Sequence, residues 1–411
     1  MKFNQILDFL EERKKTIKRY ENYDWLSFVK KEKVNIEVPL ISVAGTNRKE
    51  ETASYLEKIL ENGGYKVGYF SYDYFSCINS ISISSKAIDN STFEDIFNHC
   101  YSKIIDTRLS YFEILVLIAI TYFNQEKVDI AIIESGLGGE IDATNIPSSK
   151  ALLDVITDVS LDKTFQLGTS VSEIAYQLSG SIKENSDVLV GEIDEIAFDT
   201  INAVSQRKHS SVHKVDRYHF EFYQDPCFVF DYMPYSKLEI LSPAKYLLKS
   251  ASLALEAVKL IRTKFPLSEE AIRKGLLYGG KACRLERHRN IFIDFSHNVD
   301  AINECMSSLK LVSKDKNIRV LFATMKDKNI ASILPILSKD TKEVILTTFD
   351  NKYCKDETDY FLYLADYSYQ EDWKMALNNL LLNNKNDLIL ITGSSLFALE
   401  VKKYIEEVLH L

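Results

Sequence analysis

The chain has 411 residues, of which 46% are hydrophobic and 11% aromatic, so it is long enough for two domains and can bury a sizeable core. Its formal net charge of −9 argues against nucleic acid as the main partner, because phosphate backbones require a basic footprint. The six cysteines are scattered without a CxxC pair, which indicates reduced thiols and excludes a disulfide framework or a zinc site.

The first twenty residues alternate apolar and charged side chains at helical spacing and lack the continuous apolar region of a secretory signal. The longest apolar run, Ile114 to Ile120 with Tyr122 and Phe123 beyond it, is shorter than the ~20 residues that cross a bilayer. We therefore expect a cytoplasmic protein with no membrane partner.

Three apolar runs in the first part of the chain predict buried parallel strands, at residues 38–44, 128–133 and 151–157. The first run ends at Gly45 and is followed by a helical pattern over residues 51–62. The second ends at Glu134 and a glycine-rich turn. Ligands of parallel sheets bind beyond the carboxyl ends of the strands, so Gly45 and Glu134 both fall where a ligand is expected.

A second series of strands follows near residue 285, at residues 291–294, 318–323, 343–347 and 388–392. The intervening stretches, including residues 299–311 and 330–337, have helical patterns. This series predicts a smaller, separate α/β domain. We place the boundary just after Gly279 and Gly280, which gives domains of residues 1–284 and 285–411.

Residues 45–52 read G-T-N-R-K-E-E-T and have some properties of a phosphate loop. Such a loop needs small residues whose backbone N–H groups wrap an anion, a lysine for the outer phosphates and a hydroxyl for Mg²⁺. Lys49 and Thr52 supply the last two, but only one glycine is present. From these residues alone, an ordinary strand-to-helix turn with a charged helix start is the favoured interpretation.

Further motifs resemble one known family. Residues 134–145, E-S-G-L-G-G-E-I-D-A-T-N, match the E-x-G-L-G-G-x-x-D-A-T-N of folylpolyglutamate synthases, and residues 45–52 resemble their G-T-N-G-K-G-S-T. Residues 159–168 are similar to S-x-G-L-D-H-T-x-x-L-G, residues 284–286 to G-R-x-E, and residues 294–298 to D-x-A-H-N. The matches follow in order along nearly the whole chain, which is thus identified as a member of the folylpolyglutamate synthase/dihydrofolate synthase family of Mur ligases.

The resemblance implies an N-terminal P-loop-type ATPase domain with a mostly parallel sheet and a smaller, Rossmann-like C-terminal α/β domain of the glutamate-ligase type. It also implies ATP-dependent amide formation: the γ-carboxylate of a folate becomes an acyl phosphate, which the amine of L-glutamate attacks. ATP and Mg²⁺ would be the cofactors, a folate-type acid and L-glutamate the substrates, and the protein a monomer.

The resemblance carries individual roles over to this chain. Catalytic roles would fall to Lys49, Glu134 and His297, and Mg²⁺ would bind Glu134 together with Glu51, which stands at the family's metal-binding hydroxyl. The nucleotide would contact seven residues: Gly45, Thr46, Asn47, Lys49, Thr52, Arg284 and Asp294. Structural interpretations stay open for some of these residues, because Glu134 can be a strand-end carboxylate, Arg284 and Asp294 can pair with each other, and His297 can cap a helix.

The family positions that are altered in this chain are Arg48, Glu50, Lys163, Leu178 and Ser250. Arg48 and Glu50 replace glycines of the loop, and Lys163 and Leu178 replace a histidine and a carbamylated lysine of a second metal site. Ser250 replaces an asparagine that contacts the nucleotide. A carboxylate ~4 Å from a phosphate oxygen costs about 4 kcal/mol at an effective dielectric of ~20. Two alternatives therefore remain: an impaired or inactive homologue with a binding or regulatory role, and a ligase for a different acid.

Overall fold

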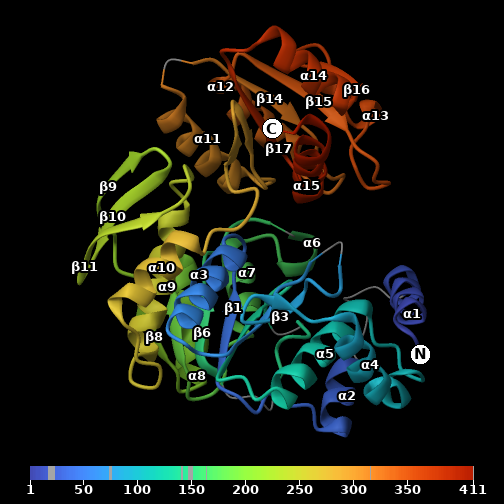
Figure 1. Ribbon diagram of the computed structural model, residues 1–411, viewed down its shortest axis with the longest axis vertical. Helices are drawn as coiled ribbons and strands as arrows, with labels where there is room; N and C mark the ends of the chain where they lie inside the picture. The colour runs from blue at the N-terminus through green and yellow to red at the C-terminus, as the bar shows by residue number, and fades with distance from the viewer. Residues whose placement is uncertain are drawn as a thin grey trace. The chain divides into compact units, whose positions relative to one another are not determined.

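The computed structural model describes residues 1–16, 24–73, 76–139, 142–146, 151–162, 164–314 and 316–410 (Figure 1). The chain forms two compact units: the first unit comprises residues 1–218 and 249–279, and the second unit comprises residues 219–248 and 280–411. Among the described residues, no helix combines the length and apolar character needed to cross a membrane.

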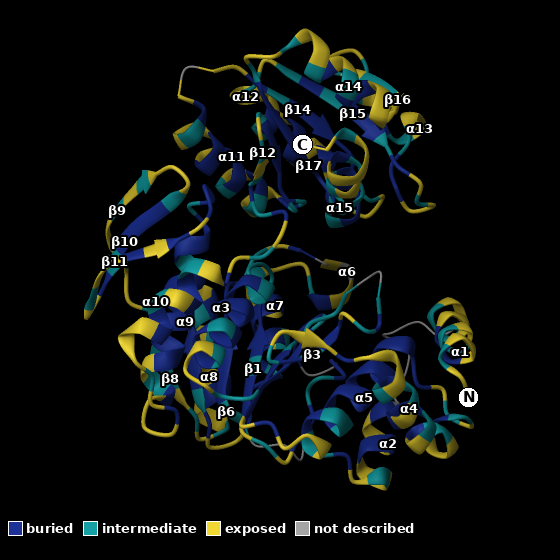
Figure 2. Cartoon of the chain, in the orientation of Figure 1, coloured by how far each residue is buried: buried dark blue, intermediate teal, exposed yellow. Residues whose placement is uncertain are grey.

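The first unit is built on a sheet of strand order β4-β3-β2-β5-β1-β6-β7-β8. Neighbouring strands from β2 to β8 are parallel, whereas β3 and β4 join at one edge in antiparallel pairs. The strands are β1 (Leu40–Ala44), β2 (Val67–Phe70), β3 (Ile81–Ile83), β4 (Lys86–Ala87), β5 (Ile130–Glu134), β6 (Ala151–Ile156), β7 (Asp187–Val190) and β8 (Ser211–Lys214). The central strands are apolar on both faces because helices cover both sides of the sheet, as is usual for parallel sheets (Figure 2).

Helices of the first unit pack against this sheet and against one another. One group, α1, α2, α4 and α5, shares a large apolar cluster with strands β2 and β5, and α3 packs closely on α10. Gly275 of α10 permits this approach, because a Cβ there would lie 2.5 Å from the backbone of Ile59. The helices are α1 (Phe3–Thr16), α2 (Asp24–Glu32), α3 (Lys49–Asn62), α4 (Asn90–Ile104), α5 (Tyr111–Gln125), α6 (Thr164–Leu167), α7 (Val171–Ser179), α8 (Glu195–Arg207), α9 (Leu247–Ile261) and α10 (Glu269–Tyr278).

The second unit contains a sheet of order β12-β13-β17-β14-β15-β16, parallel except for the β12–β13 pair, and a separate antiparallel sheet of order β11-β10-β9. Its strands are β9 (His219–Gln224), β10 (Cys227–Tyr232), β11 (Tyr235–Ile240), β12 (Glu286–His288), β13 (Ile291–Ile293), β14 (Ile318–Phe322), β15 (Glu343–Thr348), β16 (Ser368–Asp372) and β17 (Leu388–Thr392). Its helical segments are α11 (Val299–Ser313), α12 (Ile330–Lys339), α13 (Glu357–Tyr360), η1 (Phe361–Tyr363), α14 (Trp373–Asn383), α15 (Ser395–Tyr404) and η2 (Ile405–Leu409).

The predicted fold class, a mostly parallel N-terminal α/β domain followed by a smaller α/β domain, is confirmed. The predicted division into residues 1–284 and 285–411 leaves the β9–β11 sheet in the first domain, whereas the contacts group residues 219–248 with the second unit. In the structure, Ser242 donates a hydrogen bond to the backbone oxygen of Arg284, and the backbone N–H of Lys245 donates to Ser308. These contacts tie the segment after β11 to the second unit.

Candidate functional site

The loop of residues 45–48 joins β1 to α3 at the carboxyl end of the sheet. Gly45 has a φ of +142°, and a Cβ at this position would lie 2.0 Å from Oγ1 of Thr157, the residue that follows β6. The Thr157 hydroxyl donates to the backbone oxygen of Asn47 at 2.6 Å. Glycine is therefore required at position 45 because the loop is drawn against the end of the neighbouring strand.

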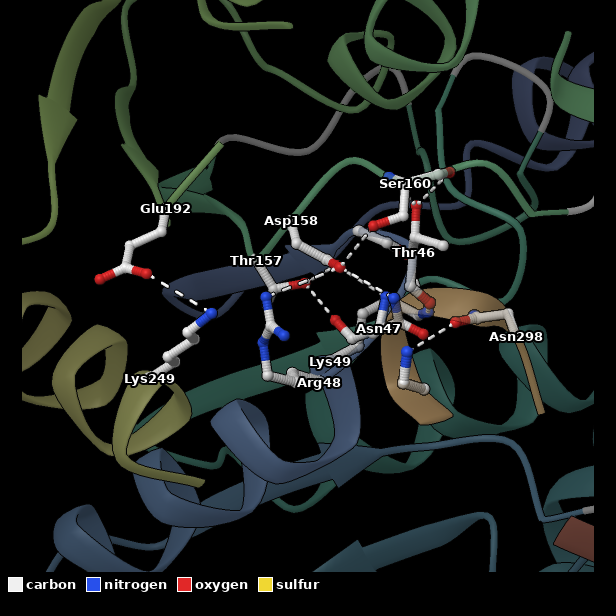
Figure 3. Close-up of polar contacts among 12 residues, drawn as sticks. Thr46, Asn47, Arg48, Lys49, Thr157, Asp158, Ser160, Glu192, Lys249 and Asn298 are labelled. Carbon is white, nitrogen blue, oxygen red and sulfur yellow. Dashed lines mark hydrogen bonds and ion pairs between the residues drawn. The ribbon is translucent and has the colours of Figure 1, made fainter. Parts of the chain in front are cut away.

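Asp158 accepts the hydrogen bonds of this loop (Figure 3). The backbone N–H of Asn47 donates to Oδ1 at 2.6 Å, and the side-chain amide of Asn47 donates to Oδ2 at 2.9 Å. The backbone N–H of Thr46 donates to the Asp158 carbonyl at 3.2 Å, while its hydroxyl bonds to the backbone of Ser160. Two N–H groups of the predicted phosphate loop thus point to a residue of the protein itself.

Arg48 has a left-handed backbone, with φ of +62° and ψ of +11°. Its guanidinium lies 3.6 Å from Oδ2 of Asp158, and the Arg48 side chain is only 9% exposed. This is the position of a family glycine, and a non-glycine residue in this conformation costs about 1–2 kcal/mol. Glu50, the other glycine replacement, lies within α3 with ordinary helical geometry, so the expected strain arises at Arg48 alone.

Lys49 begins α3, and its ammonium lies over the loop. Nζ donates to the carbonyl oxygens of Gly45 at 2.8 Å and Thr46 at 3.1 Å. One turn later, Thr52 is fully buried, and its hydroxyl has no hydrogen-bond partner among the described residues. Buried hydroxyls normally have a hydrogen-bond partner, so the Thr52 hydroxyl is a candidate to bond a ligand at the start of α3.

Glu134 ends β5, the strand beside β1, and pairs in register with Val43. The hydroxyl of Ser71, which follows β2, donates to Oε2 of Glu134 at 2.6 Å. Burial raises the pKa of Tyr69 well above its usual value, and the negative charges of Glu134 and Glu50 raise it further. The neutral Tyr69 therefore sits within the electrostatic reach of two carboxylates. Glu51, on the same first turn as Glu50, is itself buried.

The turn after Glu134 is organised by Asp142. One carboxylate oxygen accepts from the backbone N–H groups of Leu137 at 2.6 Å and Gly138 at 3.2 Å, and the other accepts from the backbone and hydroxyl of Thr144. Gly139 has a φ of +87°, and a Cβ there would lie 1.6 Å from the Gln177 carbonyl oxygen. Asp142 and Gly139 thus fix the conformation of the turn that follows Glu134.

Lys183 bonds to the carboxyl-terminal end of the same motif, at Asn145 and Ile146. Its ammonium donates to the carbonyl oxygen of Ile146 at 2.8 Å and to the side-chain oxygen of Asn145. Asn145 in turn donates to the carbonyl oxygen of Gly180 at 3.0 Å. Burial lowers the pKa of Lys183 to about 8, and burial raises the pKa of the nearby Asp154.

The other altered positions have different surroundings. Leu178 is fully buried in an apolar cluster with Ala44, Leu137, Leu167 and Ile174, so hydrocarbon fills the surroundings of the position where the family has its carbamylated lysine. Ser250, in α9, is fully buried, and its hydroxyl has no hydrogen-bond partner among the described residues. Lys163 lies outside the described residues.

In the second unit, Asp294 follows β13 and is buried with both oxygens bonded. Oδ2 accepts from the Tyr246 hydroxyl at 2.6 Å and from the backbone N–H of Leu285 at 2.9 Å. Oδ1 accepts from the backbone N–H and the hydroxyl of Ser296. Within this unit, Asp294 therefore fixes the backbone on both sides of the site, next to Arg284 and next to His297.

Arg284 and His297 are partly exposed. The Arg284 guanidinium stacks over the Phe295 ring at 4.5 Å from its centroid. His297 Nδ1 lies 2.9 Å from the Phe295 carbonyl oxygen, and because a carbonyl can only accept, Nδ1 carries the proton. The helix-capping role considered for His297 belongs instead to Asn298, whose side chain accepts from the Ala301 N–H at 2.9 Å.

The metal-binding candidates have suitable donor chemistry. Mg²⁺ in nucleotide sites takes one or two carboxylates together with phosphate oxygens and water, and Glu134 and Glu51 are carboxylates at the ends of adjacent elements. Among the described residues, the one group of three potential ligands within mutual reach is Glu286, His288 and Glu406 in the second unit. Lys402 already pairs with Glu286 at 2.8 Å, so that group is an ion-pair network.

Sequence reasoning placed the loop, Glu134 and Asp294 at strand ends, as observed, but missed three residues that organise them. Asp142 lies inside the matched motif of residues 134–145 but has no expected role there, and Lys183 lies outside the matched motifs. Asp158 was passed over, although an acidic residue directly after a buried strand, beside the predicted phosphate loop, could have drawn attention to it.

The chain is similar to proteins of known type over nearly its whole length. Residues 283–395 match the Mur ligase, glutamate ligase domain. The dihydrofolate synthase/folylpolyglutamate synthase of Bacillus subtilis is 26% identical, over 88% of this chain and 89% of that protein. The apo form of the L. casei folylpolyglutamate synthase (FPGS) superimposes with a TM-score of 0.86 at 23% identity, covering 99% of this chain and all of that one.

A complex of Escherichia coli FolC with DHPP and ADP gives a TM-score of 0.85 at 24% identity, covering 99% of this chain and 98% of that one. The fold is therefore shared throughout. In sequence and in fold, the chain is similar over nearly its whole length to the folylpolyglutamate synthases and dihydrofolate synthases, and residues 283–395 match the glutamate ligase domain of Mur ligases.

Proposed function

We propose that this chain is an ATP-dependent ligase that joins L-glutamate to the γ-carboxylate of a folate-type acid. The observation that carries the proposal is the placement of the Lys49 loop and Glu134 at the carboxyl ends of β1 and β5, which are hydrogen-bonded neighbours. A polyphosphate-binding loop and a metal-binding carboxylate are needed side by side for phosphoryl transfer.

The loop and the start of α3 would hold the phosphates. Lys49 now bonds to two loop carbonyls and needs only rotation of its flexible side chain to reach an outer phosphate. The backbone N–H groups at the first turn of α3 add the positive end of a 14-residue helix. Thr52 and the loop residues Gly45, Thr46 and Asn47 would complete the nucleotide contacts that the first unit supplies.

Mg²⁺, held by Glu134 with Glu51, would neutralise the charge of the phosphates during transfer. Ser71 orients Glu134 by donating a hydrogen bond to Oε2. Leu178 lies among apolar side chains, so this proposal includes no second metal at that position. L-glutamate would enter with its amine protonated, and the imidazole of His297 would take a proton from that amine before it attacks the acyl phosphate.

The direct test is incorporation of labelled L-glutamate into a reduced folate and, separately, into dihydropteroate, with ATP and Mg²⁺ present. We expect product with the reduced folate, release of ADP and phosphate in equal amounts, and loss of product in Lys49→Ala; product with dihydropteroate alone would move the reaction from the γ-carboxylate to the aromatic carboxylate of that acceptor. Lys58→Ala is the matched control, because Lys58 lies on the same helix and pairs only with surface groups near its other end.

Turnover with neither acceptor, while ATP still binds, would favour a ligase for another acid. The absence of both turnover and ATP binding up to millimolar concentration would reject the proposal and favour a non-catalytic role.

A further inference from the structure

The strongest feature outside the assigned roles is the Asp158 carboxylate (Figure 3). It is 5% exposed and receives hydrogen bonds from the Asn47 backbone and side chain, and at 3.3 Å from the Ser160 hydroxyl. The Arg48 guanidinium lies 3.6 Å from it. Backbone N–H, amide, hydroxyl and guanidinium donors converging on one oxyanion are the same set that binds a phosphate group.

We propose that Asp158 is the residue that sets nucleotide affinity in this chain. Its carboxylate occupies the oxyanion donors of the loop, and the ATP phosphates bind by displacing it and pairing with those donors. The inference rests on the proposed function for the identity of the ligand, but the occupied donors are a property of the first unit by itself.

The geometry makes this competition unavoidable for any phosphate that uses the loop. Asp158 directly follows Thr157 at the end of β6, so it is tethered and cannot diffuse away. Its bond to the Asn47 N–H, at 2.6 Å, is short for an N–H donor, as expected when the acceptor is charged. A phosphate approaching Asn47 therefore finds its N–H already bonded to Asp158 and is repelled by the negative charge of that carboxylate.

Arg48 gains a role from the same arrangement. Arginine has a left-handed backbone here, in place of the family glycine, and its side chain turns back onto Asp158. When phosphate displaces the carboxylate, the guanidinium becomes available to the phosphate. Asp158 therefore weakens phosphate binding, and Arg48 compensates for part of that loss by pairing with the bound phosphate.

A metal-ligand role for Asp158 fits the contacts less well. A carboxylate that binds Mg²⁺ must direct a lone pair to the ion, whereas both oxygens of Asp158 face hydrogen-bond donors and a guanidinium that repels cations. The Asp158 carboxylate therefore takes the place of a bound anion in the loop rather than that of a metal ligand.

The test is calorimetric binding of two ligands: ATP with Mg²⁺, and inorganic tripolyphosphate without metal. The proteins are the wild-type chain, Asp158→Asn, and Glu192→Gln as the matched control. Glu192 follows β7 at the same sheet edge and pairs with Lys249 at 3.5 Å, so its replacement removes an equal charge without touching the loop (Figure 3). Circular dichroism confirms folding of each variant, and Asp158→Ser replaces Asp158→Asn if the latter does not fold.

We expect Asp158→Asn to bind both ligands at least tenfold more tightly than the wild-type chain, and Glu192→Gln to bind within about twofold of it. Equal or weaker binding by Asp158→Asn overturns the inference, and loss of ATP affinity with Mg²⁺ alone would show that Asp158 is a metal ligand. No binding of either ligand to any variant overturns the inference as well.

A measurement on the wild-type chain is independent of these variants. The side-chain amide signal of Asn47, assigned by its loss in Asn47→Ser, should shift in ¹⁵N-resolved spectra when tripolyphosphate saturates the protein. An unchanged signal at saturation means that Asp158 stays in place and rejects the inference. Tight tripolyphosphate binding by Asp158→Asn without glutamate ligation by any variant would reject the proposed function only. Ligation by the wild-type chain with unimproved binding by Asp158→Asn would reject the inference only.

Discussion

Tyr246 donates its hydroxyl proton to Asp294 at 2.6 Å, and both side chains are buried. Burial and the adjacent Asp294 charge raise the pKa of Tyr246 well above its usual value, so the hydroxyl remains a donor. The bond connects the segment after β11 to the strand end that carries His297. The segment that contains Tyr246, although it lies outside the C-terminal α/β sheet, therefore helps to fix the position of Asp294.

Removing this hydroxyl should destabilise the second unit. We expect Tyr246→Phe to lower the free energy of unfolding by about 1–3 kcal/mol, because a buried carboxylate loses one of its donors. Urea denaturation followed by circular dichroism measures the change. Tyr353→Phe, an exposed tyrosine of the same unit, should be neutral. Equal stability of the two variants would contradict the account.

The turn after Glu134 should not tolerate a side chain at position 139. Gly139→Ala places a Cβ 1.6 Å from the Gln177 carbonyl oxygen at a φ of +87°, so we expect strain of about 1–2 kcal/mol plus about 1–3 kcal/mol from the clash. Gly64→Ala isolates the first contribution, since Gly64 has a φ of +88° and no atom within 4 Å of its Cβ position. Thermal unfolding of both variants gives the comparison, and similar midpoints would show that the clash is relieved by small shifts.

Lys183 predicts a defined pH dependence. Its pKa in the folded chain, about 8, is below the ordinary 10.5, so the folded state disfavours the protonated form. Between pH 8 and 10.5 the unfolded chain binds a proton that the folded chain does not, so this residue's contribution to stability rises with pH in that window. Below pH 8 its penalty is fully present.

The measurement is the free energy of unfolding at pH 7.5 to 10 for the wild-type chain and Lys183→Met, with the exposed Lys264→Met as control. Other groups titrate equally in each protein, so the difference isolates Lys183. We expect the wild-type slope to exceed that of Lys183→Met by up to about 1.4 kcal/mol per pH unit and to match that of Lys264→Met. Parallel curves for wild type and Lys183→Met would be incompatible with a buried ammonium.

His297 should affect turnover far more than stability. Its side chain is partly exposed and its Nδ1 bonds to the Phe295 carbonyl, so His297→Ala should leave the unfolding midpoint nearly unchanged. Loss of a proton acceptor should reduce kcat about 100-fold or more, with a smaller change in the KM for L-glutamate. Steady-state assays test this, with the exposed His99→Ala as control. A change confined to KM would assign His297 to binding alone.

Local sequence patterns predicted the central elements well, for a physical reason. Strands β1, β5 and β17 are buried on both faces, so they are continuous apolar runs in the sequence. Strand β9 and strand β11 are half exposed and mix polar with aromatic residues, so their sheet left no comparable pattern. Matching motifs likewise located Glu134 and Asp294, because each motif surrounds a strand end.

The contacts that complete the site were beyond such reasoning. Asp158 and Asn47 are separated by 111 positions, and Tyr246 and Asp294 by 48, so neither pairing has a local signature. The sequence identified Arg48 as an altered position, but only the fold brings its guanidinium to Asp158. Pairing between distant segments depends on the topology of the sheet, which periodicity alone does not specify.

The β9–β11 sheet interrupts the first unit in the middle of its sequence, and the chain passes between the two units at residues 218–219, 248–249 and 279–280. A fragment that starts at residue 285 would therefore lack Tyr246 and expose an unsupported Asp294, while one that ends at residue 218 would lack α9 and α10. Neither half is encoded by a single continuous stretch. Genetic dissection at any one point therefore leaves a unit incomplete, and exchange of the second unit with that of a relative must move residues 219–248 and 280–411 together and keep residues 249–279 in place.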